Sequence, residues 1–248
     1  RWGALAAVGA GLAVAGLLFA IVHLAIYTGL TPYAAGDHFT GGELTVSGAD
    51  PNYAGRANRL IGLLVDRWFG LAAWAPVYLF AVPALGALLR RRPPGAPILL
   101  ALVLVGWLNA TFVAFTMHGW WWPGRQVVVV LPAVVLATAW AAELVLTSHA
   151  ARRWRRPVIG LFLAATLFGV VTWLLWLVPS LRSGWGVVTD FEQHPLPVLA
   201  VWQRVLPDGR TLGTADRVGL AVWASLVAFG VGLGWRTARP PASAPTSD

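Results

Sequence analysis

The sequence contains no cysteine, no lysine and only one methionine among its 248 residues. The absence of cysteine excludes disulfide bonds, thiolate catalysis and cysteine-ligated metals. Charged residues are also scarce, at 11% of the chain, whereas 58% of the residues are hydrophobic and the mean hydropathy is +0.68. A soluble domain with so few charges could not cover its surface with polar groups. The composition therefore predicts an integral membrane protein, with membrane lipid as its surroundings.

Arginine supplies all 18 positively charged side chains, against 10 acidic residues, and the formal net charge is +8. The arginines stand in short clusters between long apolar runs rather than along one basic face. Such clusters are typical of signals that orient membrane helices. Because we find no segment that reads as a soluble domain to present these charges, we expect no nucleic-acid partner.

Six apolar stretches are long enough to cross a hydrocarbon core about 30 Å thick, which takes about 20 helical residues. We place them at residues 3–28, 71–89, 97–116, 127–147, 158–178 and 217–235. They predict an all-α, polytopic transmembrane helix bundle over residues 1–239, followed by a disordered tail at 240–248 that is rich in Pro and Ala. The chain begins at Arg1 rather than methionine, and we expect it to be a piece of a longer protein.

The arginine clusters predict the orientation of the bundle. They follow the second, fourth and sixth spans, and therefore share one side if every span crosses the membrane. By the positive-inside rule that side is cytoplasmic, and both termini lie there. The clusters are Arg90 to Arg92; Arg152, Arg153, Arg155 and Arg156; and Arg236 with Arg239. Eight of the ten acidic residues fall on the opposite side or at its boundary, so we expect polar chemistry outside.

The first external connection predicts more structure than a linker needs. "GGELTVSGADPNYAG" reads as a short strand or hairpin bounded by Gly and Asp-Pro turns. "RANRLIGLLVDRWFG" then predicts an amphipathic helix that lies along the outer membrane interface. Its apolar face comprises Leu60, Ile61, Leu64, Val65 and Trp68. In the third external connection, at residues 179–216, we expect a short helix around "LAVWQRVL".

Several residues within the spans predict local structure. Pro76 and Pro83 are expected to kink the second span. His23 has no evident partner in the first span, and we expect it to be packed and neutral. Rows of small residues four apart predict close helix packing, because hydrophobicity does not drive helices together in lipid. These rows are Ala7, Gly11 and Ala15 in the first span, and Ala224, Ala228 and Gly232 in the sixth.

Asp37 and His38 are adjacent in the first external connection, with Glu43 close behind them. A carboxylate beside an imidazole can perform acid-base chemistry or hold a cation. No metal-ligand spacing such as HxxxH or HxxE accompanies the pair, so we assign neither a metal nor another cofactor. A functional role and a structural one both remain open for these residues.

The stretch "MHGWWWPGRQVVVVLP", residues 117–132, combines aromatic residues with one arginine. The membrane interface alone explains Trp120, Trp121 and Trp122, as it does Trp68. It does not explain Arg125, which stands at the predicted amino-terminus of the fourth span, where the helix dipole disfavours a cation. A helix amino-terminus with an arginine suits a phosphate or carboxylate, and His118 could add a donor. Anion binding and pairing of Arg125 with an external acid are both open.

The segment "DRWFGLAAWAPVYLFAVPALGALLRRR", followed by "MHGWWWPGRQVVVVLP", resembles the later part of polytopic bacterial proteins related to the GT-C membrane glycosyltransferases. The resemblance covers about residues 60–135. It implies a multi-pass protein of the bacterial plasma membrane that takes a sugar from a polyprenyl-phosphate carrier on the extracytoplasmic face. The matching residues are Asp66, Phe69, Gly70 and Leu71 in the first phrase, and Trp121, Trp122, Gly124, Arg125, Leu131 and Pro132 in the second.

The resemblance implies roles for the candidate residues. Arg125 and His118 would contact the carrier phosphate, and Asp37, His38 and Glu43 would border the sugar or the acceptor. The catalytic carboxylate of that family usually lies in an earlier, amino-terminal module, so we assign no catalytic residue and expect a carboxy-terminal module.

The sequence departs from the family pattern at one place. Trp122-Pro123 replaces the usual Gly-Gly after the tryptophans. A non-catalytic membrane subunit or a small transporter is the alternative function.

Overall fold

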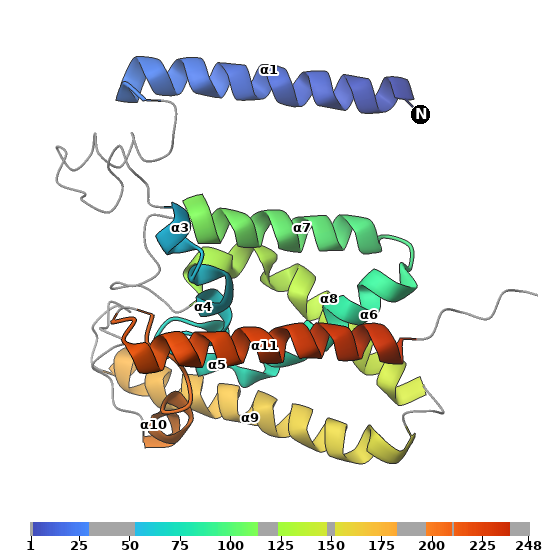
Figure 1. Cartoon of the computed structure of the whole chain (residues 1–248), viewed down its shortest axis with the longest axis vertical. Coiled ribbons are helices and arrows are strands. Elements are labelled where there is room, and N and C mark those ends of the chain that lie inside the picture. Colours follow the sequence, from blue (N-terminus) through green and yellow to red (C-terminus); the bar gives the residue numbers. More distant parts are fainter. Residues whose placement is uncertain are drawn as a thin grey trace, which may run out of the picture. The chain divides into compact units, whose positions relative to one another are not determined.

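The computed structural model describes residues 2–29, 53–113, 124–147, 152–182, 197–209 and 211–238. The described residues are mainly helical, and they form no strand (Figure 1). Five helical stretches are long and apolar enough to cross a membrane, so the chain is an integral membrane protein with the all-α fold that the sequence predicted. They are Gly9–Tyr27, Ala96–Val113, Arg125–Thr147, Arg153–Leu175 and Thr214–Thr237.

The chain divides into two units, residues 1–55 and residues 56–248. The first unit contains α1 (Trp2–Tyr27), in which His23 is buried, with 8% of its surface exposed. The His23 ring lies between the rings of Phe19 and Tyr27, with centroid distances of 4.6 and 4.7 Å. Its Nδ1 lies 3.2 Å from the Gly29 carbonyl oxygen. Because a carbonyl only accepts hydrogen bonds, this contact is a hydrogen bond when Nδ1 carries the proton, and Gly29 is a neighbour that the sequence did not reveal.

The second unit contains the remaining helices, and α3 (Tyr53–Arg56) lies across the boundary between the units. Four of the predicted spans are continuous here, within a few residues of the predicted bounds. The elements are α4 (Arg59–Val65), α5 (Leu71–Trp74), η1 (Pro76–Phe80), α6 (Ala81–Arg91), α7 (Ala96–Leu108), η2 (Asn109–Val113), η3 (Arg125–Val130), α8 (Leu131–Thr147), α9 (Arg152–Arg182), α10 (Pro197–Gln203) and α11 (Thr214–Thr237). The helix α10 confirms the short helix predicted around "LAVWQRVL".

The second predicted span is not one continuous helix. It consists of α5, η1 and α6, and the break falls at Ala75, which is extended (φ −142°, ψ 81°). Pro76 explains the break, because proline has no N–H to donate and disfavours helical geometry in the residue before it. Pro83 lies in the first turn of α6, directly after η1. The predicted distortion therefore occurs at Pro76, where it is a full break.

The helices α6 and α11 pack with their backbones in contact. A Cβ atom at Gly86 would collide with the Val231 carbonyl oxygen, and one at Gly234 would collide with the Pro83 carbonyl oxygen. Neither contact leaves room for a methyl group, so glycine is needed at both positions. Close approach through small residues is a typical way for helices to associate in lipid.

The sequence predicted the wrong row of small residues for this contact. Gly230 and Gly234 face α6, and a Cβ at Gly230 would lie 2.9 Å from the Val82 Cγ1 atom. Gly232, in the predicted row with Ala224 and Ala228, has no atom within 4 Å of its Cβ position. The true row is displaced by two residues, onto a different face of the helix.

The segment predicted as an interfacial amphipathic helix forms the short helix α4 and a turn. Four consecutive residues, Gly62 to Val65, are buried, so α4 is enclosed on more than one face. The Arg56 side chain is buried as well, and it donates a hydrogen bond to the Phe112 carbonyl oxygen at 2.9 Å. The predicted hairpin falls largely outside the described residues, apart from residues 53–55 in α3.

The second unit has two chemically distinct ends (Figure 1). At one end α6, α8 and α11 finish and α7 and α9 begin, and we name it the arginine-rich end. The clusters at 90–92 and 152–156 and Arg236 gather there, as the topology predicted. At the opposite end α5, η3 and α11 begin, and α10 contacts α5 there. That end holds the candidate site.

Candidate anion-binding site at the polar junction

Several segments meet at the end opposite the arginine clusters: residues 66–71, 124–125, 203–209 and 211–216. We name this meeting point the polar junction, and the fully buried Asp66 is its centre. The Asp66 Oδ1 atom accepts hydrogen bonds from the N–H groups of Trp68 (2.9 Å) and Phe69 (2.8 Å). Its Oδ2 atom accepts one from the N–H group of Gly209 at 2.8 Å. One carboxylate thus closes the turn after α4 and joins it to the turn after α10.

Two more carboxylates extend this hydrogen-bonded network. Asp208 accepts a hydrogen bond from the Trp68 indole Nε1 at 3.1 Å. Asp216, at the start of α11, accepts from the N–H group of Asp208 (2.9 Å) and from the Thr211 hydroxyl (3.1 Å). The three acids therefore all serve to hold backbone and side-chain donors of neighbouring segments. No group of three potential metal ligands occurs within the described residues.

Arg67 and Gln203 fix α10 to the turn after α4. The Arg67 Nε atom donates to the carbonyl oxygens of Gln203 and Leu206, both at 3.1 Å. In return, the Gln203 side-chain amide donates to the Arg67 carbonyl oxygen at 3.1 Å. Trp202 adds a hydrogen bond from its indole N–H to the Ala72 carbonyl oxygen at 2.7 Å. These contacts are reciprocal, so the two segments are positioned by each other.

The two phrases that carry the GT-C resemblance are in direct contact. The Gly124 N–H group donates a hydrogen bond to the Phe69 carbonyl oxygen at 3.2 Å. Gly124 has φ +78°, and a Cβ atom there would lie 2.6 Å from the Leu71 Cδ2 atom. A Cβ atom at Gly70 would lie 2.7 Å from the Asp66 carbonyl oxygen. Gly124 is therefore required by its left-handed backbone, and Gly70 is required because backbone atoms leave no space for a side chain.

Arg125 follows this contact directly and is exposed. It begins the continuous helical run of η3 and α8, which extends over 23 residues to Thr147. A guanidinium group offers five N–H donors in a planar fork that matches phosphate or carboxylate. The anchored Gly124 thus places an exposed cation at the edge of the polar junction.

Most of the other predicted site residues lie outside the described residues. These are Asp37, His38, Glu43, His118, Trp120, Trp121 and Trp122. Trp68 is half-buried and donates to Asp208, and its membrane-interface role stays a prediction. The sequence did not predict that Asp66, Asp208 and Asp216 belong to one hydrogen-bonded network. The Pro-Asp-Gly turn at 207–209 was the available signal for this part of the junction.

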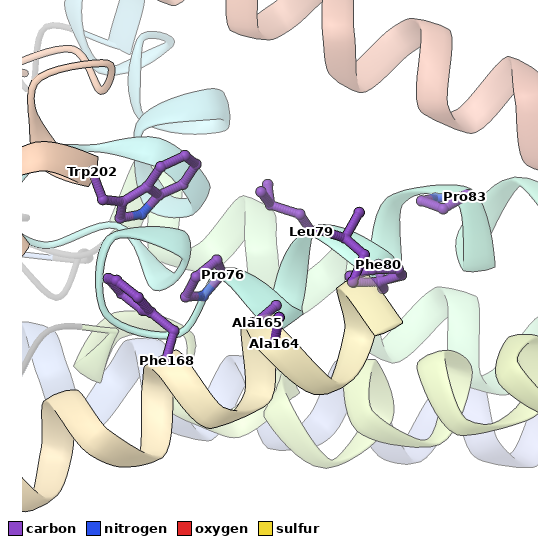
Figure 2. Close-up of a pocket in the computed structure, with 9 residues that line it drawn as sticks. Pro76, Leu79, Phe80, Pro83, Ala164, Ala165, Phe168 and Trp202 are labelled. Carbon is purple, nitrogen blue, oxygen red and sulfur yellow. The ribbon is translucent and has the colours of Figure 1, made fainter. Parts of the chain in front are cut away.

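An apolar groove of about 480 Å³ runs between η1, α6 and α9 (Figure 2). Its volume falls in the usual range for ligand sites, roughly 300–1,000 Å³. The side chains of Pro76, Phe168 and Trp202 stand at one end of the groove, and Pro83 stands at the other. The full lining comprises Pro76, Leu79, Phe80, Pro83, Leu161, Ala164, Ala165, Phe168 and Trp202. Because no charged side chain lines it, the groove suits a hydrocarbon chain rather than a sugar.

No family model matches the chain, and no curated protein or solved structure matches it either. The fold and the site together define a membrane-embedded helical protein. Its exposed Arg125 stands beside a tightly built polar junction, and an apolar groove lies between its helices.

Proposed function

We propose that this chain is the carboxy-terminal module of a GT-C-like glycosyltransferase, which uses a polyprenyl-phosphate-linked sugar on the extracytoplasmic face of the bacterial plasma membrane. The observation that carries the proposal is the exposed Arg125 held directly beside the contact between Gly124 and Phe69. The resemblance connects these two phrases, and they are neighbours in space. An arginine is suited to a phosphate because it forms two parallel, charge-assisted hydrogen bonds with it.

The groove supports the hydrocarbon part of the proposal. A polyprenyl carrier has a long apolar chain, and the groove between η1 and α9 offers about 480 Å³ of apolar space. Burial of apolar carbon contributes roughly 25 cal/mol per Å² to affinity, before the costs of binding. In this proposal Arg125 and His118 contact the phosphate, and the groove accepts part of the chain.

The remaining candidates complete the proposed site. Asp37, His38 and Glu43 would border the sugar or the acceptor, and the catalytic carboxylate would come from a preceding module. Trp120, Trp121 and Trp122 would seat their loop in the headgroup layer, where indole rings are favoured.

Substitution of Arg125 by alanine in the full-length protein tests this function. We expect Arg125→Ala to lower transfer from a labelled polyprenyl-phosphate sugar by about 10- to 100-fold, because a hydrogen bond to a charged group contributes roughly 1.5–3 kcal/mol. Arg182→Ala is the matched control, since Arg182 is an exposed arginine at the same end of the unit. Unchanged turnover and carrier affinity in Arg125→Ala would rule out the phosphate role.

A non-catalytic membrane subunit is the second candidate function. The observation in its favour is that Asp66, Asp208 and Asp216 all accept hydrogen bonds that hold the fold together. Carboxylates committed in this way are poorly placed to act as general acids or bases. The same transfer assay separates the two candidates. If the chain is a non-catalytic subunit that binds or stabilises a partner, Arg125→Ala should leave the rate of sugar transfer unchanged.

A further inference from the structure

The arginine-rich end carries a strongly charged surface that the proposed function does not use. Six of its described arginines are exposed, and the only acid among the described residues there is the exposed Glu143 near the end of α8. These arginines lie at or directly beyond the ends of three helices, α6, α9 and α11. They are Arg90, Arg92, Arg153, Arg155, Arg156 and Arg236, and we name them the arginine surface.

Two tryptophans lie among these arginines. The Arg90 Cζ atom is 5.3 Å from the ring centroid of Trp235, and the Arg153 Cζ atom is 5.3 Å from that of Trp154. Trp154 is 60% exposed. An exposed indole is apolar and also carries an N–H donor, so it is favoured in the headgroup layer of a bilayer. The cations and rings together have the chemistry of a bilayer interface.

Helix stability does not explain all of the positive charge. Arg90 lies in the last turn of α6, where the helix dipole favours a cation. The arginines at 153, 155 and 156 lie near the amino-terminus of α9, where the dipole disfavours cations, and the first turn holds no acidic residue. An anion from outside the protein would stabilise these exposed cations.

We propose that the arginine surface binds the headgroups of anionic phospholipids, so that the leaflet around this end is enriched in them. The charge is complementary, since each such headgroup carries a negative phosphate and the surface holds six exposed cations against one glutamate. The spread over three helix ends fits a lipid surface, because a single small anion could not contact them all. Each arginine close to an anionic bilayer strengthens attraction about fivefold.

Brominated lipids can test this enrichment directly. The chain has no cysteine, so Thr147→Cys, at the end of α8, gives a single labelling position for a fluorophore near the surface. The full chain is placed in nanodiscs of phosphatidylcholine mixed with phosphatidylglycerol, and one lipid at a time is brominated to quench the label. Nanodiscs expose both membrane faces, so the orientation of the chain does not affect the result.

We expect brominated phosphatidylglycerol to quench the label at least about fivefold more effectively per lipid than brominated phosphatidylcholine. Arg155→Gln with Arg156→Gln should clearly lower this preference, and lysine at both positions should retain it. The control removes the same charge from the opposite end, through Arg182→Gln with Arg204→Gln, and should leave the preference intact. Equal quenching by both lipids would overturn the proposal, as would an equal loss in the control variant.

Discussion

Replacement of Asp66 by alanine is expected to lower the free energy of unfolding by about 3–5 kcal/mol. The carboxylate accepts hydrogen bonds from the N–H groups of Trp68, Phe69 and Gly209, and Asp66 is fully buried. Each buried donor left without an acceptor costs about 1–3 kcal/mol, and partial relaxation of the turns reduces the sum. The turns after α4 and α10 should separate, because this carboxylate joins them.

Reversible unfolding in detergent micelles, followed by tryptophan fluorescence, measures this effect. Asp66→Asn keeps one acceptor oxygen, so it should lower the free energy of unfolding by less, about 1–3 kcal/mol. Glu143→Gln removes an exposed carboxylate and should change stability by less than about 0.5 kcal/mol. If Asp66→Ala were as stable as Glu143→Gln, the network around Asp66 would not hold the junction together.

Gly234→Ala should destabilise the second unit by about 2–3 kcal/mol. The added methyl group would collide with the carbonyl oxygen of Pro83, and a backbone atom cannot rotate away as a side chain can. The helices α6 and α11 would have to separate. Gly86→Ala should act in the same direction, because its methyl group would collide with the carbonyl oxygen of Val231.

Gly232→Ala provides a closely matched control on the same helix. Its Cβ position has no atom within 4 Å, so the substitution creates no clash and reduces backbone entropy in the unfolded chain. We expect it to be neutral or to stabilise by up to about 1 kcal/mol. Thermal unfolding of both variants in one detergent compares them, and equal stabilities would contradict the packing of α6 on α11.

Much of the architecture was predictable because local sequence determines it. Long apolar runs predicted the spans near residues 97–116, 127–147, 158–178 and 217–235, since a bilayer requires about 20 apolar helical residues. Pro76 predicted where the second span departs from a regular helix, because proline acts on its own backbone and on the residue before it.

The contacts between helices were less predictable from the sequence. Helix α11 has glycines at 230, 232 and 234, so small-residue rows exist in two registers. Only the position of α6 determines that Gly230 and Gly234 form the contact. Amphipathicity was also misleading for α4, because Gly62 to Val65 are enclosed by neighbouring segments that the local pattern does not include.

The polar junction could not be predicted from sequence spacing. Asp66 and Gly209 are 143 residues apart, and their hydrogen bond depends on how α4 and α10 pack. The phrase containing Phe69, Gly70 and Leu71 contacts Gly124 in the fold, a contact that its spacing in the sequence does not predict. The sequence predicted a role for Arg125 because the helix dipole disfavours a cation at a helix amino-terminus, and that role stays a prediction.

Binding of a polyprenyl phosphate to the purified chain tests the proposed function most directly. Titration in detergent should be compared with the matching polyprenol, which has the same hydrocarbon chain and lacks the phosphate. We predict that the phosphate strengthens binding by about tenfold or more, that Arg125→Ala removes most of this gain, and that Arg182→Ala retains it. Equal affinity for the polyprenol and its phosphate would contradict a carrier-phosphate site at Arg125.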